Sequence, residues 1–245
     1  MVSRLAAAGG VIAAIAALLI LAPRYIASTK VETPTTKAEL SAALLTQSQL
    51  YAALADNFPE EFNELVGELY AIGPQGEAAA EQLSSDYMIR FRMEYAEALL
   101  AATDQALTSY LASVAETYDA AALALSNAEC GLFAAGHPDV LAAAIDDPRV
   151  FRAIDAQSAA MIRAMASATG QEPRALANQT DWNTFKRELA ADPLSETYSP
   201  LVAEEVIVDP AYCAALVWYI TAISTAEGDA GERVKASFAQ RVATP

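Results

Sequence analysis

Cysteine and histidine, which support thiol redox chemistry and nucleophile–base catalysis, are rare in this chain. Cys130 and Cys213 are its only cysteines, and they lie 83 positions apart. In an oxidising compartment two such cysteines often pair. Closing a loop of that length would stabilise the fold by about 4–5 kcal/mol on the chain-entropy model. We therefore expect a disulfide if the domain is exported; the alternative is two independent buried thiols that pack as small hydrophobic groups.

His137 is the only histidine, seven residues after Cys130. A cysteine and a histidine can act as nucleophile and base. However, His137-Pro138 is typical of the start of a helix, because proline is favoured at the first helical position. We expect a structural role for His137, and no metal site, since such a site needs several ligands that converge.

A row of carboxylates follows Pro59. Glu60, Glu64 and Glu68 recur every four residues, with Glu61 beside them. Carboxylates can perform acid–base chemistry or bind calcium when others converge on them from different segments. A linear row on one helix is more typical of a solvated face. The chain also lacks the common calcium-loop, phosphate-loop, nucleophile-elbow, zinc-helix and haem-attachment motifs. We therefore assign no catalytic, cofactor-binding or metal-ligating residue and expect no cofactor.

The composition indicates an all-α fold. Hydrophobic residues make up 54% of the 245 residues, many of them alanine, and there are only 10 glycines. Alanine is the best helix former, and strand-favouring runs are nearly absent. The formal net charge is −16. Such a charge repels nucleic acid and anionic lipid headgroups and attracts basic protein surfaces, although an acidic coat also serves solubility.

Residues 1–27 predict a transmembrane or signal-anchor helix. An uncharged run from Leu5 to Ala22 lies between Arg4 and Pro23-Arg24. Its length is at the short end of a membrane span, and it also resembles a secretory signal. No clean pair of small residues marks a cleavage site, so we favour an uncleaved anchor; the alternative is an exported protein that is soluble after cleavage.

The anchor also carries a stripe of small residues, Ala6, Gly10 and Ala14, which could pack against another membrane helix. Basic residues lie on both sides of the run, so the orientation is weakly specified. The short basic head and the two cysteines favour a body outside the cytoplasm, periplasmic if the protein is bacterial.

After a linker at residues 28–36, we expect one acidic α-helical domain over residues 37–245. Capping residues, prolines and apolar periodicity predict its helices. The expected ranges are 36–56, 59–72, 77–128 with an optional restart at 84–86, 147–169, 180–190, 209–226 and 231–242. Cys130-Gly131 is expected to end the long third helix. Further helix starts are expected at Pro138, Pro173 and Pro200.

The leading functional hypothesis is a membrane-tethered helical protein that acts by protein–protein contact, as an accessory, assembly or structural subunit of an envelope or membrane complex. Its expected partners are the membrane, through the N-terminal helix, and a protein in or near the membrane. The second hypothesis is an extracytoplasmic ligand-binding or sensory helical bundle. The third is an uncharacterised hydrolase, which would need a deep pocket where acidic residues meet His137.

Overall fold

The computed structural model describes residues 36–244, and every regular element in that range is a helix. The predicted all-α fold is confirmed for this part of the chain. The predicted anchor at residues 1–27, with Ala6, Gly10 and Ala14, lies outside the described residues. Within residues 36–244 no helix has both the length and the apolar character needed to cross a membrane.

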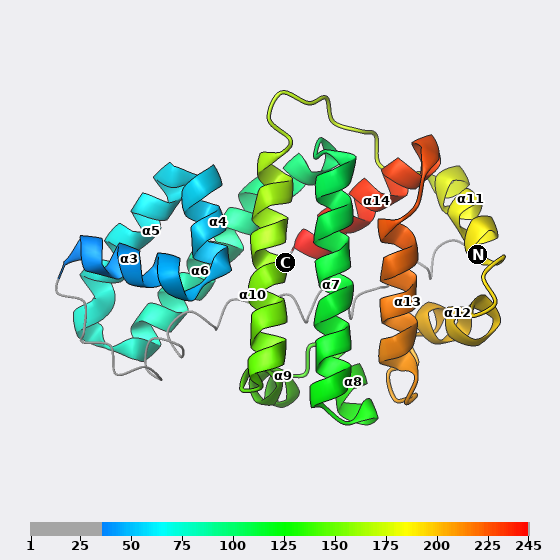
Figure 1. Ribbon diagram of the computed structural model, residues 1–245, viewed down its shortest axis with the longest axis horizontal. Helices are drawn as coiled ribbons and strands as arrows, with labels where there is room; N and C mark the ends of the chain where they lie inside the picture. The colour runs from blue at the N-terminus through cyan, green and yellow to red at the C-terminus, as the bar shows by residue number, and fades with distance from the viewer. Residues whose placement is uncertain (1–35, 245) are drawn as a thin grey trace.

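The first four α-helices of the described residues form a lobe at one end of the molecule, which we call the small lobe (residues 36–95; Figure 1). They are α3 (Lys37–Gln47), α4 (Gln49–Asn57), α5 (Pro59–Ile72) and α6 (Glu77–Tyr95), with a short 3-10 turn, η2 (Gly73–Gln75), before α6. The predicted capping box is confirmed, because the Glu39 amide donates to the Thr36 hydroxyl and the Thr36 amide donates to the Glu39 carboxylate.

The first predicted helix is interrupted at Ser48, where the backbone is extended. The Ser48 side chain caps α4, and Asp155 of a distant helix accepts hydrogen bonds from the backbone amides of Gln49 and Leu50. The sequence around Ser48 predicts no break, because the second capping group lies more than a hundred residues away.

The long third helix is also divided, but not at Ser84–Asp86 as the sequence suggested. Ser84 is buried inside α6, where its hydroxyl meets the Tyr51 hydroxyl at 2.9 Å. The break follows Tyr95, through the 3-10 turn η3 (Ala96–Leu100), and the Thr103 side chain caps the next helix, α7 (Asp104–Ala124).

Three long helices run side by side in the main bundle (residues 96–244; Figure 1): α10 (Pro148–Ala166), α7 and α13 (Tyr212–Ser224). The uncharged α13 is buried along one face through Leu216, Ile220 and Ile223. The prediction of a buried central helix there is confirmed. The last helix, α14 (Gly228–Ala243), crosses beside them and ends at the buried Arg92, whose Nε donates to the Ala243 carbonyl at 2.8 Å.

Two short helices, α8 (Asn127–Ala134) and α9 (Pro138–Ile145), close one end of the bundle. The predicted stop at Cys130-Gly131 is wrong, because both residues lie within α8. Gly131 is there for a different reason: an added Cβ would lie 1.7 Å from the carbonyl oxygen of Ile207. Glycine thus allows the segment before α13 to pass against α8.

On the side of α13 away from α7, α12 (Ser195–Ala203) packs against α13, whereas α11 (Gln179–Leu189) packs mainly against α14. Asn178 caps α11. The guanidinium of Arg233, on α14, donates two hydrogen bonds to the Asp181 carboxylate, from Nη2 at 2.6 Å and from Nε at 3.0 Å. The helix starts predicted at Pro173 and Pro200 are wrong. Pro173 lies in the irregular segment between α10 and α11, and Pro200 lies inside α12.

Candidate functional site

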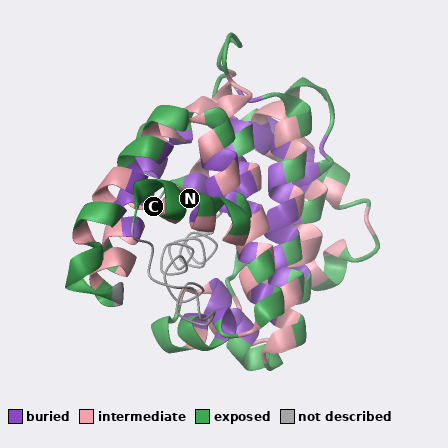
Figure 2. Cartoon of the chain, turned by 60° about the vertical axis from the view of Figure 1, so that its left-hand side comes forward, coloured by how far each residue is buried: buried purple, intermediate pink, exposed green. Residues whose placement is uncertain are grey.

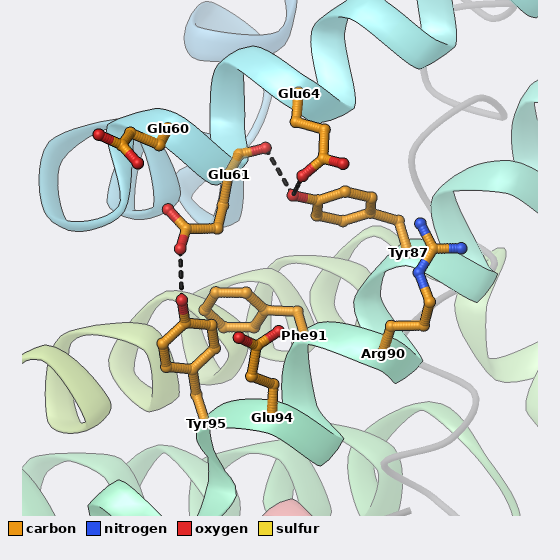
Figure 3. A pocket seen from close by; sticks show the side chains of 8 residues that line it. All are labelled: Glu60, Glu61, Glu64, Tyr87, Arg90, Phe91, Glu94 and Tyr95. Atoms are coloured by element: carbon orange, nitrogen blue, oxygen red, sulfur yellow. Dashed lines mark hydrogen bonds between the residues drawn. The ribbon is translucent and has the colours of Figure 1, made fainter.

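A hollow of about 340 Å³ opens between α5 and α6 in the small lobe (Figure 3). We call it the acidic cleft. Its walls combine carboxylates with aromatic rings and one guanidinium. The lining residues are Glu60, Glu61, Glu64, Tyr87, Arg90, Phe91, Glu94 and Tyr95.

The amphipathic character of α5 places the carboxylates. Pro59 occupies the start of the helix, and acidic residues in the first turn interact favourably with the positive end of the helix dipole. The opposite face of α5 is buried through Phe62, Leu65, Val66 and Leu69. Figure 2 shows the same division across the small lobe, with exposed residues on the outer side of its helices. Glu60 and Glu64 therefore remain exposed at the rim.

The aromatic floor of the acidic cleft comes from α6. Tyr87, Phe91 and Tyr95 lie on successive turns, so their side chains share one face of the helix. The rings of Phe91 and Tyr95 lie 4.6 Å apart, and Phe58 packs edge-on against both. Tyr87 and Phe91 are buried, whereas Tyr95 is half-buried. The floor is thus part of the core and is held rigidly.

Two tyrosine hydroxyls tie this floor to α5. The Tyr87 hydroxyl donates to the main-chain carbonyl of Glu61 at 2.7 Å, and the Glu64 carboxylate lies 3.4 Å from the same hydroxyl. The Tyr95 hydroxyl donates to the carboxylate of Glu61 (Figure 3). These bonds orient the Glu61 carboxylate across the cleft and fix the separation of the two helices.

The environment of the cleft raises the pKa values of its two tyrosines. The hydrogen bond to Glu61, followed by burial and by the negative charges of Glu61, Glu94 and Glu60, raises the pKa of Tyr95 to about 12. Burial, and then the charges of Glu64 and Glu61, raise the pKa of Tyr87 well above its ordinary range. Both hydroxyls therefore stay protonated at neutral pH. Tyr95 donates to the Glu61 carboxylate, and Tyr87 donates to the Glu61 main-chain carbonyl.

One cation of the chain lies at the edge of the acidic cleft. The Arg90 guanidinium lies 5.3 Å from the centre of the Tyr87 ring and forms an ion pair with Glu68 at 3.6 Å. Arg90 is exposed. Within residues 36–244, no Lys or Arg side chain forms an ion pair with Glu60, Glu61, Glu64 or Glu94. The cleft therefore concentrates negative charge that basic side chains of the described chain leave uncompensated.

The other residues singled out from the sequence lie elsewhere. Cys130 of α8 and Cys213 of α13 are brought together at disulfide-bonding distance, with their Cα atoms 6.1 Å apart. Both are buried, so neither sulfur is placed as an accessible nucleophile. His137 is exposed at the start of α9 and does not line the acidic cleft. In the described part of the chain, no cluster of His, Cys, Asp and Glu has the arrangement of a metal site.

The sequence predicts one wall of this site. The row from Glu60 to Glu68 indicates a solvated helix face, because the sequence alone shows no second segment that converges on it. The converging residues are Tyr87, Glu94 and Tyr95 of α6. The aromatic residues Tyr87, Phe91 and Tyr95 recur every four residues, and this spacing predicts a core-facing stripe. In the structure these side chains form the floor of the cleft. That this stripe faces α5 follows only from the folded arrangement.

Comparison with known proteins adds no relative: no family model, curated protein or solved structure matches the chain.

Proposed function

We propose that this protein is a membrane-tethered helical subunit that acts by protein–protein contact, and that the acidic cleft is its contact surface for a basic partner. The tether is the apolar run from Leu5 to Ala22, and the partner lies in or near the membrane. The body is proposed to lie outside the cytoplasm, where the cysteine pair would persist as a disulfide.

The observation that carries this proposal is the uncompensated charge of the acidic cleft. The small lobe holds ten acidic residues against three basic ones, and one of those three, Arg92, is buried against the end of α14. Like charges held together on a surface repel one another, and a bound counter-charge relieves this repulsion, although an acidic coat also serves solubility. A rigid aromatic floor beneath the carboxylates adds contact area of the kind that is enriched at protein interfaces.

A second candidate is a ligand-binding helical bundle. The volume of the cleft, about 340 Å³, is at the lower end of small-molecule sites. Such sites bury most of their ligand, whereas Glu60, Glu64 and Glu94 are exposed at the rim. This open, charged rim suits a protruding side chain of another protein better than an enclosed small molecule.

Affinity capture tests the proposal. The tagged full-length chain is recovered from membranes of its own host in mild detergent, and co-purifying proteins are quantified. We compare the wild type with a cleft-pair variant (Glu60→Gln with Glu94→Gln) and a control-pair variant (Glu116→Gln with Asp119→Asn). The control residues are exposed acids of α7, and the two variants change the charge equally.

The proposal predicts a partner in stoichiometric amount that the wild type and the control pair retain and the cleft pair loses. A strictly monomeric chain in all three samples would refute it. A partner retained equally by the cleft-pair variant would refute the acidic cleft as the contact surface.

A further inference from the structure

The acidic cleft already binds one guanidinium of this chain at its edge. At its edge, the Arg90 guanidinium lies over the Tyr87 ring and is paired with the Glu68 carboxylate. One aromatic ring and one carboxylate thus hold one guanidinium. This arrangement combines a cation–π contact with an ion pair.

The remainder of the cleft repeats the same two components without a cation. Tyr95 supplies a half-buried ring, and the Glu61 carboxylate is held beside it by the Tyr95 hydroxyl. Glu60 and Glu94 flank this pair from α5 and α6, as Figure 3 shows. The second position therefore has the same two components as the first, about two helical turns further along α6, and has more negative charge.

We propose that this second position binds an arginine side chain of the partner protein, with the guanidinium against Tyr95 and paired with Glu61, Glu60 and Glu94. The inference rests on the proposed contact function, because the same cleft provides the surface. It adds the chemistry of the partner residue.

Arginine fits this position better than lysine for two reasons. Its planar guanidinium is weakly hydrated and stacks on aromatic rings, whereas the ammonium group of lysine is compact and strongly hydrated. Its several N–H donors also reach carboxylates on both sides at once, which matches carboxylates supplied by two different helices. A purely electrostatic surface would not distinguish the two residues.

Three matched peptides test the inference directly. They share the sequence acetyl-Gly-Ser-X-Ser-Gly-amide, with arginine, lysine or citrulline at X; citrulline has nearly the shape of arginine and no charge. Each is titrated against the full-length chain in phosphatidylcholine nanodiscs, and binding is followed by saturation-transfer difference NMR on the methylene protons of X. Empty nanodiscs give the blank.

The arginine peptide is expected to bind about threefold more tightly than the lysine peptide and about tenfold more tightly than the citrulline peptide. The cleft-pair variant, Glu60→Gln with Glu94→Gln, should weaken the arginine peptide by about twofold to fivefold per lost charge, as for exposed ion pairs. The control-pair variant, Glu116→Gln with Asp119→Asn, should leave it unchanged. Tyr95→Phe, which keeps the ring, should retain the preference for arginine over lysine.

Equal affinity for arginine and lysine would overturn the inference, as would equal loss of binding in the two charge variants, since both indicate diffuse attraction. Absence of any arginine-dependent signal would overturn it as well. These outcomes are separable from those of the capture experiment. If the cleft-pair variant loses a captured partner but the peptides show no preference for arginine, the contact function stands and the arginine inference fails. If the peptides show a preference for arginine but no partner is captured, the contact function fails and only the arginine preference of the cleft remains.

Discussion

The Ser48 hydroxyl donates a hydrogen bond of 2.6 Å to the Asp155 carboxylate and thereby joins the small lobe to α10 of the main bundle. The same carboxylate accepts from the backbone amides of Gln49 at 2.7 Å and Leu50 at 3.1 Å, which have no partners within α4. Asp155 is thus a capping residue supplied from another part of the chain. It fixes where α4 begins and, through α4, where the acidic cleft stands relative to the main bundle.

Replacing Asp155 with alanine is expected to lower the free energy of unfolding by about 2 kcal/mol, because a cap and hydrogen bonds to a charged group are lost together. Hydrogen exchange should show faster opening of α4 than of α13. Denaturant unfolding of Asp155→Ala beside Asp119→Ala, which removes an exposed acid of α7, measures the effect. Equal stability of the two variants would show that the Asp155 cap contributes nothing.

Gly131→Ala is expected to destabilise the fold by about 3 kcal/mol or more, since the added methyl would collide with the main-chain carbonyl of Ile207 and neither backbone segment can move freely. Gly73→Ala is the matched control. Gly73 has helical backbone angles and open space around it, so alanine there should be neutral or stabilising by up to about 1 kcal/mol. Thermal unfolding of both variants decides the point, and a Gly131→Ala protein as stable as Gly73→Ala would contradict the close approach of α8 to residue 207.

Thiol labelling tests the pairing of Cys130 and Cys213. Chain purified from its own membranes and denatured without reductant should take up no label, and it should take up two labels after reduction. The double variant Cys130→Ala with Cys213→Ala should lose about 4–5 kcal/mol of stability, because the unfolded chain is no longer constrained by a closed loop. Two labels before reduction would remove both the disulfide and the main support for an oxidising compartment.

Tyr51 gives a prediction for alkaline pH. Burial raises the pKa of Tyr51 to about 12, from about 10 in an unfolded chain. The folded state therefore holds this proton more tightly. The resulting stability is fully present below about pH 10 and is lost as the pH rises toward about 12.

Between about pH 9 and about pH 11, the wild type should therefore lose about 1.3 kcal/mol more stability than Tyr51→Phe, which has no phenol to ionise at this position. Urea unfolding of both proteins at the two pH values measures this difference. Identical losses would mean that the Tyr51 hydroxyl ionises as readily in the folded protein as in the unfolded chain.

Local signals in the sequence predicted much of this fold. Thr36 with Glu39, Pro59 and Asp147-Pro148 mark helix starts that the structure confirms, because each of these signals acts on backbone groups within a few residues of it. The errors arise where the deciding partner is distant. The break at Ser48 depends on Asp155, and Gly131 serves the packing of Ile207 rather than the end of a helix.

The acidic cleft likewise combines features that the sequence predicts with one that it does not predict. The carboxylate row of α5 and the aromatic stripe of α6 are each readable as helical patterns. Their juxtaposition is not, because it depends on the turn at Gly73–Gln75 and on the hydrogen bonds from Tyr87 and Tyr95 to Glu61. A sequence pattern gives the face of each helix, but the choice of which faces meet is a tertiary property.

We propose that the acidic cleft contacts a partner protein at the membrane. Site-specific photo-crosslinking in intact membranes tests it most directly, with benzoylphenylalanine placed at Asn63, an exposed neighbour of Glu64 on α5, or at Asp119 of α7 as the control. We predict a discrete adduct from position 63, none from position 119, and loss of the position 63 adduct when Glu60→Gln and Glu94→Gln are added. Identical adducts from both positions, or a position 63 adduct that survives the loss of both carboxylates, would contradict the account.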